Sequence, residues 1–545
     1  MMKKRWLGIL ALALTAVGCC AITSCEKATD VQGLIYEKIE GKEEYRVATN
    51  YMEPVITHIT IPETYLGLPV TEIGDYAFYK YNGLTSVEIP DSVTTIGNSA
   101  FENCDSLTSV VIPDSVTTIG DDAFYYCSSL TSVEIPDSVT TIGERAFSGC
   151  SSLTSVVIGD SVTTIGESAF SYCDSLTSVV IPDSVTTIGD DAFYYCDKLT
   201  SVEIPDSVTT IGNSAFENCN KLIFNEYGNC QYLGSEKNPY YAIIGVKNKD
   251  YGTYHLHKDT KLLAGYIFGN CGNMKSINLN EGLIYISNGA FSSCSNLTSV
   301  VIPDSVTTIG DKAFRFCSRL TSVVIPDSVT TIGSYAFADC STLTEITLPF
   351  IGTGNNAHLG YIFNTTQAEK PWEYVPKSLR KVTVTSATSI AAHTFENCDG
   401  LTSIVLGDSV TAIGGSAFYD CNGLTSVEVG DGVTSIGDFA FYNCNKLTSF
   451  KIGKKVTSIG DYTFFNCGSL TSIVIPSCVT TVAHSAFDGC GNLTAVYYQG
   501  NAEKWAAIDF SGANDFFTNI TRYYYSETEQ SGCWHYDENG EVAVW

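Results

Sequence analysis

The sequence predicts an elongated repeat solenoid, in which each repeat forms one coil that stacks on its neighbours. A 23-residue unit, L-T-S-V-x-I-P-D-S-V-T-T-I-G-x-x-A-F-x-x-C-x-x, recurs almost unchanged. A fixed period of this length is typical of solenoids, whose repeats bury a shared core only when they stack. We therefore expect function on a long repeated surface rather than in one catalytic pocket. The copies begin at Leu84, Leu107, Leu130, Leu153, Leu176 and Leu199.

Each unit divides into three predicted segments. Alternation in residues 84–89 predicts a strand that buries its Val and Ile and turns Glu88 outward. This L-x-x-L-x-L pattern is that of a leucine-rich repeat. Residues 90–92 predict a turn, and residues 93–97 a second short extended segment. The A-F-x-x-C residues fit a short helical turn that faces the core.

Interruptions of the period divide the chain into segments. Two inserts break the array, and we expect atypical ends to cover the open core. The predicted segments are a signal peptide with lipobox (1–25), an N-terminal entry and cap segment (26–69), a repeat array (70–222), an insert (223–262), a second array (263–349), a second insert (350–378), a third array (379–497) and an aromatic C-terminal cap (498–545).

The first residues predict export. A basic start, Lys3 to Arg5, precedes the uncharged apolar run 6–23. The following cysteine, Cys25, lies in a sequence that resembles a bacterial lipobox, and Cys19 is the alternative lipidation site. We expect a lipid-anchored cell-surface protein or a secreted one, with a plain N-terminal membrane anchor as the other interpretation.

The charge balance restricts the partners. The formal net charge is −29. Nucleic-acid binding without sequence preference needs clustered Lys and Arg, and so does docking on anionic lipid. We therefore expect no nucleic-acid partner, and membrane contact only through the lipid anchor.

Cysteine usage allows two interpretations. The chain has 21 Cys, most of them at one position of the repeat after A-F-x-x. Free Cys behaves as a small buried hydrophobe, which favours a buried column of thiols. The other interpretation is that some of these residues form disulfides, because stacked coils would bring them about 5 Å apart. Zinc is disfavoured, since no C-x-x-C spacing occurs.

The repeat unit resembles that of the BspA-like (treponemal-type) leucine-rich repeat family of bacterial cell-surface proteins, and the resemblance covers residues 70–497. The resemblance implies surface display, attachment to host extracellular proteins and contact with other microbial cells. It implies no enzymatic activity, and it supplies no catalytic residue or cofactor.

Two sets of variable positions are candidates for binding. The first, the strand row, lies outward on the predicted strands, although β-branched residues also simply favour strands. The second is a set of tyrosines on the turn segment, and the recurrence of 121–127 as 190–196 also indicates block copying. The strand row is Glu88, Val111, Glu134, Val157, Val180 and Glu203, continued by Val301, Val324, Val405, Glu428, Lys451 and Val474; the tyrosines are Tyr125, Tyr126, Tyr194 and Tyr195.

Signatures of enzymes and metal sites are missing from the sequence. It contains no H-E-x-x-H, nucleophile elbow or P-loop. His255 and His257 have no evident third ligand, and the Pro-Asp-Ser column is ordinary turn chemistry. The main hypothesis is an adhesin-like binding protein for host or microbial surface macromolecules. The alternatives are a glycan-capture lipoprotein of a nutrient-uptake system, with Tyr240, Tyr241 and Trp372 as sites, or a passive envelope spacer.

Overall fold

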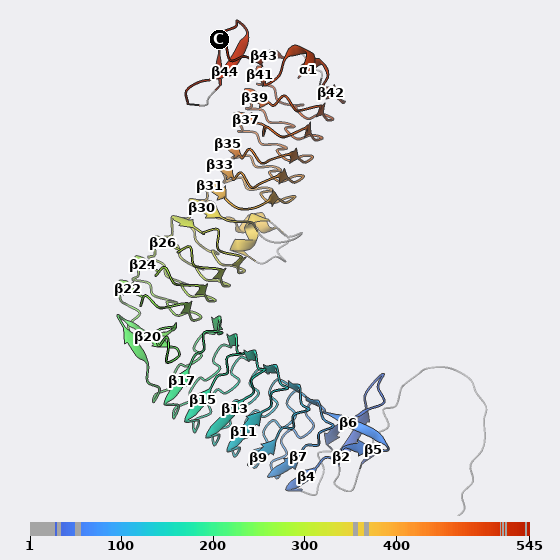
Figure 1. Ribbon diagram of the computed structural model, residues 1–545, viewed down its shortest axis with the longest axis vertical. Coiled ribbons are helices and arrows are strands. Elements are labelled where there is room, and N and C mark those ends of the chain that lie inside the picture. Colours follow the sequence, from blue (N-terminus) through green and yellow to red (C-terminus); the bar gives the residue numbers. More distant parts are fainter. Residues whose placement is uncertain are drawn as a thin grey trace, which may run out of the picture.

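The computed structural model is a β-solenoid of about 20 coils of roughly 23 residues, with little helix. The coils stack along a curved path that changes direction near β20 (Figure 1). This confirms the predicted fold class. The structure describes residues 28–29, 34–49, 56–351, 358–364, 370–512, 514, 517, 520–539 and 542–545. Within these ranges no helix combines the length and apolarity needed to cross a bilayer.

The first strand of most coils pairs in parallel with the same strand of the next coil, in four successive sheets. Ser132 lies opposite Ser155, an offset of one repeat, so that identical positions stack in columns. In the first half these strands are β4 (His58–Thr60), β7 (Ser86–Glu88), β9 (Ser109–Val111), β11 (Ser132–Ile135), β13 (Ser155–Ile158), β15 (Ser178–Val180) and β17 (Ser201–Glu203). In the second half they are β22 (Thr253–His255), β24 (Ser276–Asn278), β26 (Ser299–Val301), β28 (Ser322–Val324), β30 (Glu345–Leu348), β31 (Lys381–Val384), β33 (Ser403–Leu406), β35 (Ser426–Val429), β37 (Ser449–Lys451), β39 (Ser472–Ile475) and β41 (Ala495–Tyr498).

The second extended segment of each coil forms a shorter parallel column. It is preceded by β1 (Ala28–Thr29), β2 (Leu34–Lys38) and β3 (Tyr45–Thr49), while β5 (Thr64–Tyr65) pairs with β6. The column comprises β6 (Leu68–Ile73), β8 (Thr95–Ile96), β10 (Thr118–Ile119), β12 (Thr141–Ile142), β14 (Thr164–Ile165), β16 (Thr187–Ile188) and β18 (Thr210–Ile211). It resumes as β23 (Leu262–Leu263), β25 (Tyr285–Ile286), β27 (Thr308–Ile309), β29 (Thr331–Ile332), β32 (Ser389–Ile390), β34 (Ala412–Ile413), β36 (Ser435–Ile436), β38 (Ser458–Ile459), β40 (Thr481–Val482) and β42 (Asp509–Phe510).

The third segment of the coil forms successive turns where a short helical turn is expected. Backbone N–H groups of alternate residues donate to the next coil, as from Ser99 to the Asp121 carbonyl at 2.8 Å and from Phe101 to the Ala123 carbonyl at 2.7 Å. A helix would direct these groups to its own preceding turn. The inter-coil bonds are made with Ser99 at φ 53° and Asn103 at φ 58°, which no helix contains. We call this series of inter-coil bonds the turn ladder.

A side-chain ladder beside the second strands was not foreseen from the sequence. The carboxylate of Asp121 accepts the Glu144 N–H 23 residues later at 2.7 Å, and Asn98 accepts the Asp121 N–H at 2.9 Å. The preceding I-G pair allows the coils to approach, because a Cβ on Gly120 would lie 2.8 Å from the Asn98 nitrogen. The recurrent Asp or Asn after I-G was the signal for this structural role.

The core consists of the eight apolar positions of each coil. In one coil Leu130, Val133, Ile135, Val139, Ile142, Ala146, Phe147 and Cys150 are all buried. The phenylalanines form a stacked column, with Phe147 lying 5.1 Å from Phe124 and 5.5 Å from Phe170 between ring centroids. This arrangement follows from exact repetition, because each ring meets an identical ring one coil away.

The column of cysteines is a column of free thiols in the described residues. The Sγ of Cys127 donates to the Phe101 carbonyl at 3.1 Å, and the same bond recurs from coil to coil. Burial raises the pKa of Cys150 to about 12. The thiols therefore act as small buried donors, as the first of the two interpretations expects.

Both interruptions contain ordered segments. The first has a hairpin of β19 (Asn225–Tyr227) and β20 (Cys230–Leu233), followed by β21 (Ala242–Val246). It lies where the core divides into two hydrophobic clusters. The N-terminal cluster extends to Ala264 and the C-terminal cluster starts at Cys230, so residues of the insert contribute to both. The second interruption has the 3-10 helices η1 (Leu359–Phe363) and η2 (Pro371–Tyr374).

The C-terminal segment closes the open end of the core. It comprises α1 (Ala502–Ala506), β43 (Thr521–Tyr525), β44 (Cys533–Tyr536) and β45 (Val542–Val544). Trp505 and Trp534 are buried, and Phe517 continues the phenylalanine column 4.1 Å from Phe487. The aromatic tail thus buries the last coil.

Candidate binding surface

The strand row of the first array is a line of exposed side chains on two successive parallel sheets, β4-β7-β9 and β11-β13-β15-β17. Glu134 lies beside Val157 and Val180 beside Glu203 in the parallel register, and Val111 lies beside Glu88. Adjacent strands place such neighbours about 4.8 Å apart. Val111, Val157 and Val180 are 76%, 58% and 78% exposed, so the row presents apolar side chains between carboxylates.

Glu88 differs from the other members because it already has partners. It accepts a hydrogen bond from the Thr60 hydroxyl at 3.0 Å, and His58 Nε2 lies 3.7 Å from its carboxylate. The Glu88 carboxylate is therefore already engaged within the chain.

At its far end the strand row borders a hollow of about 870 Å³. Val180 and Glu203 line it from β15 and β17, and Ser235 to Lys237, after β20, form another wall. The first insert therefore turns the end of a flat face into a concavity with apolar, acidic and basic groups. Sequence reasoning selected Val180 and Glu203 but gave no signal that residues 235–237 would lie against them.

The turn-edge tyrosines form two clusters on a separate side of the coils. The rings of Tyr125 and Tyr126 are 4.5 Å apart, and those of Tyr194 and Tyr195 are 4.6 Å apart, both edge to face. Tyr172 stacks on Tyr195 at 5.2 Å and so enlarges the second cluster. Within the described residues no bond joins either cluster to the strand row, so the candidates form two surfaces rather than one site.

One predicted outward position is wrong. Val474 is 6% exposed, and Val405 is half-buried. Val474 lies in one column between Lys451 and Tyr497. The C-terminal hairpin crosses this column, with Tyr536 under the Lys451 ammonium at 4.7 Å and Trp534 at 5.7 Å from the Tyr497 ring. A tail distant in sequence therefore covers a face that the repeat alone leaves open.

The aromatic residues proposed for glycan capture do not present open rings. Tyr241 is buried and donates to the Val208 and Asp206 carbonyls at 2.9 and 3.0 Å. Tyr240 stacks on His257 at 3.9 Å, and Trp372 is half-buried near His358. These rings hold the inserts together, which leaves little flat aromatic surface for a sugar.

Metal-binding geometry is not found in the part of the chain that the structure describes. No cluster of three or more His, Cys, Asp or Glu there could hold an ion. In the Pro-Asp-Ser column, hydrogen bonds from Thr385 and Ser386 lower the pKa of Asp327. The candidate lipidation residues Cys25 and Cys19 lie outside the described residues.

Solved structures similar to this chain include bacterial leucine-rich repeat proteins. One from Bacteroides ovatus is 26% identical, covering 92% of this chain and 100% of that one with a TM-score of 0.30. A leucine rich cell surface protein from Faecalibacterium prausnitzii is 25% identical, covering 90% and 99% with a TM-score of 0.25. The pneumococcal vaccine antigen PcpA is 19% identical, covering 90% and 98% with a TM-score of 0.34. No curated protein sequence matches the chain significantly.

The family comparison covers most of the chain. The model of the BspA type leucine rich repeat region matches residues 50–176, 163–236, 250–366 and 386–515. These ranges include most of the regular coils, leave out β31, and reach into both inserts and the C-terminal segment. The chain therefore belongs to the BspA type leucine-rich repeat family, as its repeat unit predicts.

Proposed function

We propose that this chain is a surface-displayed, adhesin-like protein that binds host or microbial surface proteins through the strand row of its first array. Proteins of this family are generally bacterial surface proteins and typically non-enzymatic. Export, with a lipid anchor at Cys25 or alternatively Cys19, is part of the proposal.

The observation that carries the proposal is the row of exposed valines that leads into the hollow beside Val180 and Glu203. Burying a Val side chain stabilises a complex by about 1.5 kcal/mol or more, and a polar rim gives specificity. Carboxylates in the row, together with Lys237, would orient a partner of complementary charge.

The test is capture of partners by residues 26–545 from extracellular-matrix and cell-surface extracts. Val157→Lys combined with Val180→Lys should reduce capture at least tenfold, because each places an ammonium in the apolar part of the interface. The matched control is Val301→Lys with Val324→Lys, which changes two equally outward, adjacent valines of the second array.

The outcomes separate the alternatives. Loss with the first pair and retention with the second supports the first-array site. Retention with both pairs contradicts it. Capture of soluble glycans that neither pair changes would instead favour the nutrient-uptake alternative.

A further inference from the structure

The turn ladder ends abruptly at the first insert. In the preceding coil the N–H groups of Asp191, Phe193 and Tyr195 donate to the carbonyls of Asn213, Ala215 and Glu217 at 2.8 to 3.0 Å. The next residues in these columns are Ser214, Phe216 and Asn218. Their N–H groups donate no hydrogen bond to any described residue.

The coil on the other side of the first insert lacks donors for its backbone carbonyls. In a regular coil the carbonyls at the positions of Gly265, Ile267 and Gly269 accept the ladder from the coil before. Here the Gly265 and Ile267 carbonyls accept no hydrogen bond from the described part of the chain. The Gly269 carbonyl accepts one from the Lys249 ammonium at 3.1 Å, so that a side chain replaces one missing backbone donor.

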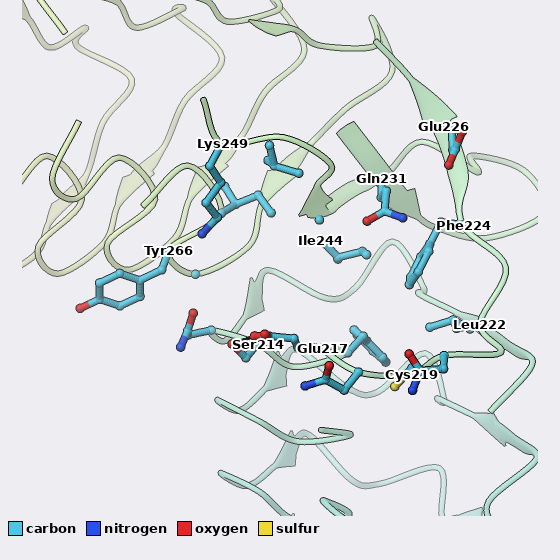
Figure 2. Close-up of a pocket in the computed structure, with 18 of the residues that line it drawn as sticks. Ser214, Glu217, Cys219, Leu222, Phe224, Glu226, Gln231, Ile244, Lys249 and Tyr266 are labelled. Carbon is cyan, nitrogen blue, oxygen red and sulfur yellow. Dashed lines mark hydrogen bonds between the residues drawn. The ribbon is translucent and has the colours of Figure 1, made fainter. Parts of the chain in front are cut away.

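Both deficient edges line the same cavity, of about 740 Å³, which we call the notch. Figure 2 shows Ser214, Glu217 and Leu222 on one side and Ile244, Gln231 and Lys249 on the other. The notch is closed at one end, where the Gly265 N–H donates to the Ile211 carbonyl at 2.8 Å. Its volume lies in the range of ordinary ligand sites.

The second interruption shows what fills such a gap in this fold. There η1 takes the place of the missing coil, because the Tyr335 and Phe337 N–H groups donate to the Asn364 and Ile362 carbonyls at 3.0 Å. The Leu359 N–H then donates to the Thr394 carbonyl at 2.8 Å and continues the ladder. Among the described residues the first insert supplies no such backbone, and Ser214, Phe216 and Asn218 line the notch without a backbone acceptor for their N–H groups.

We propose that the notch binds a peptide segment of a partner protein in the same turn conformation as the coils, which completes the turn ladder by backbone addition. Donors at alternate residues, from Ser214 to Asn218, match carbonyls at alternate residues of a segment in this turn conformation, as Asn213, Ala215 and Glu217 supply them to the coil before. Phe216, Phe224 and Ile244 would contact an apolar side chain of that segment. This site is separate from the strand row and does not depend on the function proposed for it.

The test measures hydrogen exchange at residue resolution in the full chain. The probe is the acetylated peptide Gly-Asn-Ser-Ala-Phe-Glu-Asn, which copies Gly212–Asn218, the segment that accepts the ladder of the coil before it. Without peptide, the amides of Ser214, Phe216 and Asn218 should exchange faster than those of Asp191, Phe193 and Tyr195. Millimolar peptide should slow them at least tenfold.

Two controls define the result. The all-D enantiomer has the same composition and charge but cannot form the same ladder, and it should leave exchange unchanged. Ile244→Trp fills the notch and should abolish the effect, whereas Val180→Lys on the strand row should preserve it. Slow exchange in the free chain, no slowing by the peptide, or equal slowing by the enantiomer would overturn the proposal. The enantiomer comparison uses the unaltered chain, so it decides even if Ile244→Trp fails to fold.

Discussion

Replacing one phenylalanine of the stacked column tests the physical basis of the fold. Phe147 is fully buried and lies between the parallel rings of Phe124 and Phe170, tilted from them by 5° and 4°. Phe147→Ala removes the ring, leaves a cavity and breaks both stacking contacts. The backbone of the coil is unaffected, because the Phe147 N–H still donates to the Ala169 carbonyl.

The expected cost is large and local. Phe→Ala in a core costs about 3–5 kcal/mol, and this range includes the lost ring contacts. Because coils of a solenoid contact only their neighbours, the loss should fall on the coils next to residue 147. At 1.4 kcal/mol per factor of ten, amides there that exchange by local opening should exchange roughly 100- to 4000-fold faster.

Native-state hydrogen exchange, supported by urea unfolding followed by circular dichroism, measures this effect. Phe316→Ala is the matched control, because Phe316 is 44% exposed on the turn edge and lies outside the column. It should cost less than about 1 kcal/mol. Equal destabilisation by the two substitutions, or acceleration spread evenly over all arrays, would refute the reasoning.

Two further predictions follow from the thiol column and the C-terminal cap. Burial raises the pKa of Cys150 and Cys340 to about 12, above the value of about 8.5 in an unfolded chain. The neutral thiols therefore contribute their full stabilisation below pH 8.5, and this contribution is lost as the pH rises toward 12. The urea concentration at the unfolding midpoint should therefore decrease as the pH rises from 8 to 11. The decrease should be less steep in Cys150→Ala than in a Cys533→Ala control, and a midpoint independent of pH would contradict buried neutral thiols. Trp534→Ala should cost about 3–5 kcal/mol locally and speed exchange in β41 and β43, because its indole packs on Tyr497 and donates to the Tyr498 carbonyl at 3.1 Å. Trp545→Ala, at the 37% exposed C-terminal residue, is its control, and equal effects would show that Trp534 does not hold the cap.

The repeat determined most of the fold and the composition of its surfaces. Because each coil contacts an almost identical coil, the burial of Phe147 and Cys150 and the exposure of Val157 follow from position within the unit. The short helical turn was harder to predict, since the A-F-x-x-C spacing does not distinguish a helical turn from turns that bond to the next coil. That choice depends on the backbone of a neighbouring coil, which no local pattern describes.

The sequence by itself determined that this protein is a stacked coil with buried phenylalanine and cysteine columns and an outward row of Val and Glu. Only the tertiary structure decided where that regular surface is modified. The C-terminal hairpin covers Val474, residues 235–237 form a wall beside Val180, and the first insert leaves the notch open while η1 fills the second gap. The reason is that a repeat specifies contacts between equivalent positions. Inserts and ends have no equivalent, so their contacts depend on backbone groups and side chains that meet only in the folded chain.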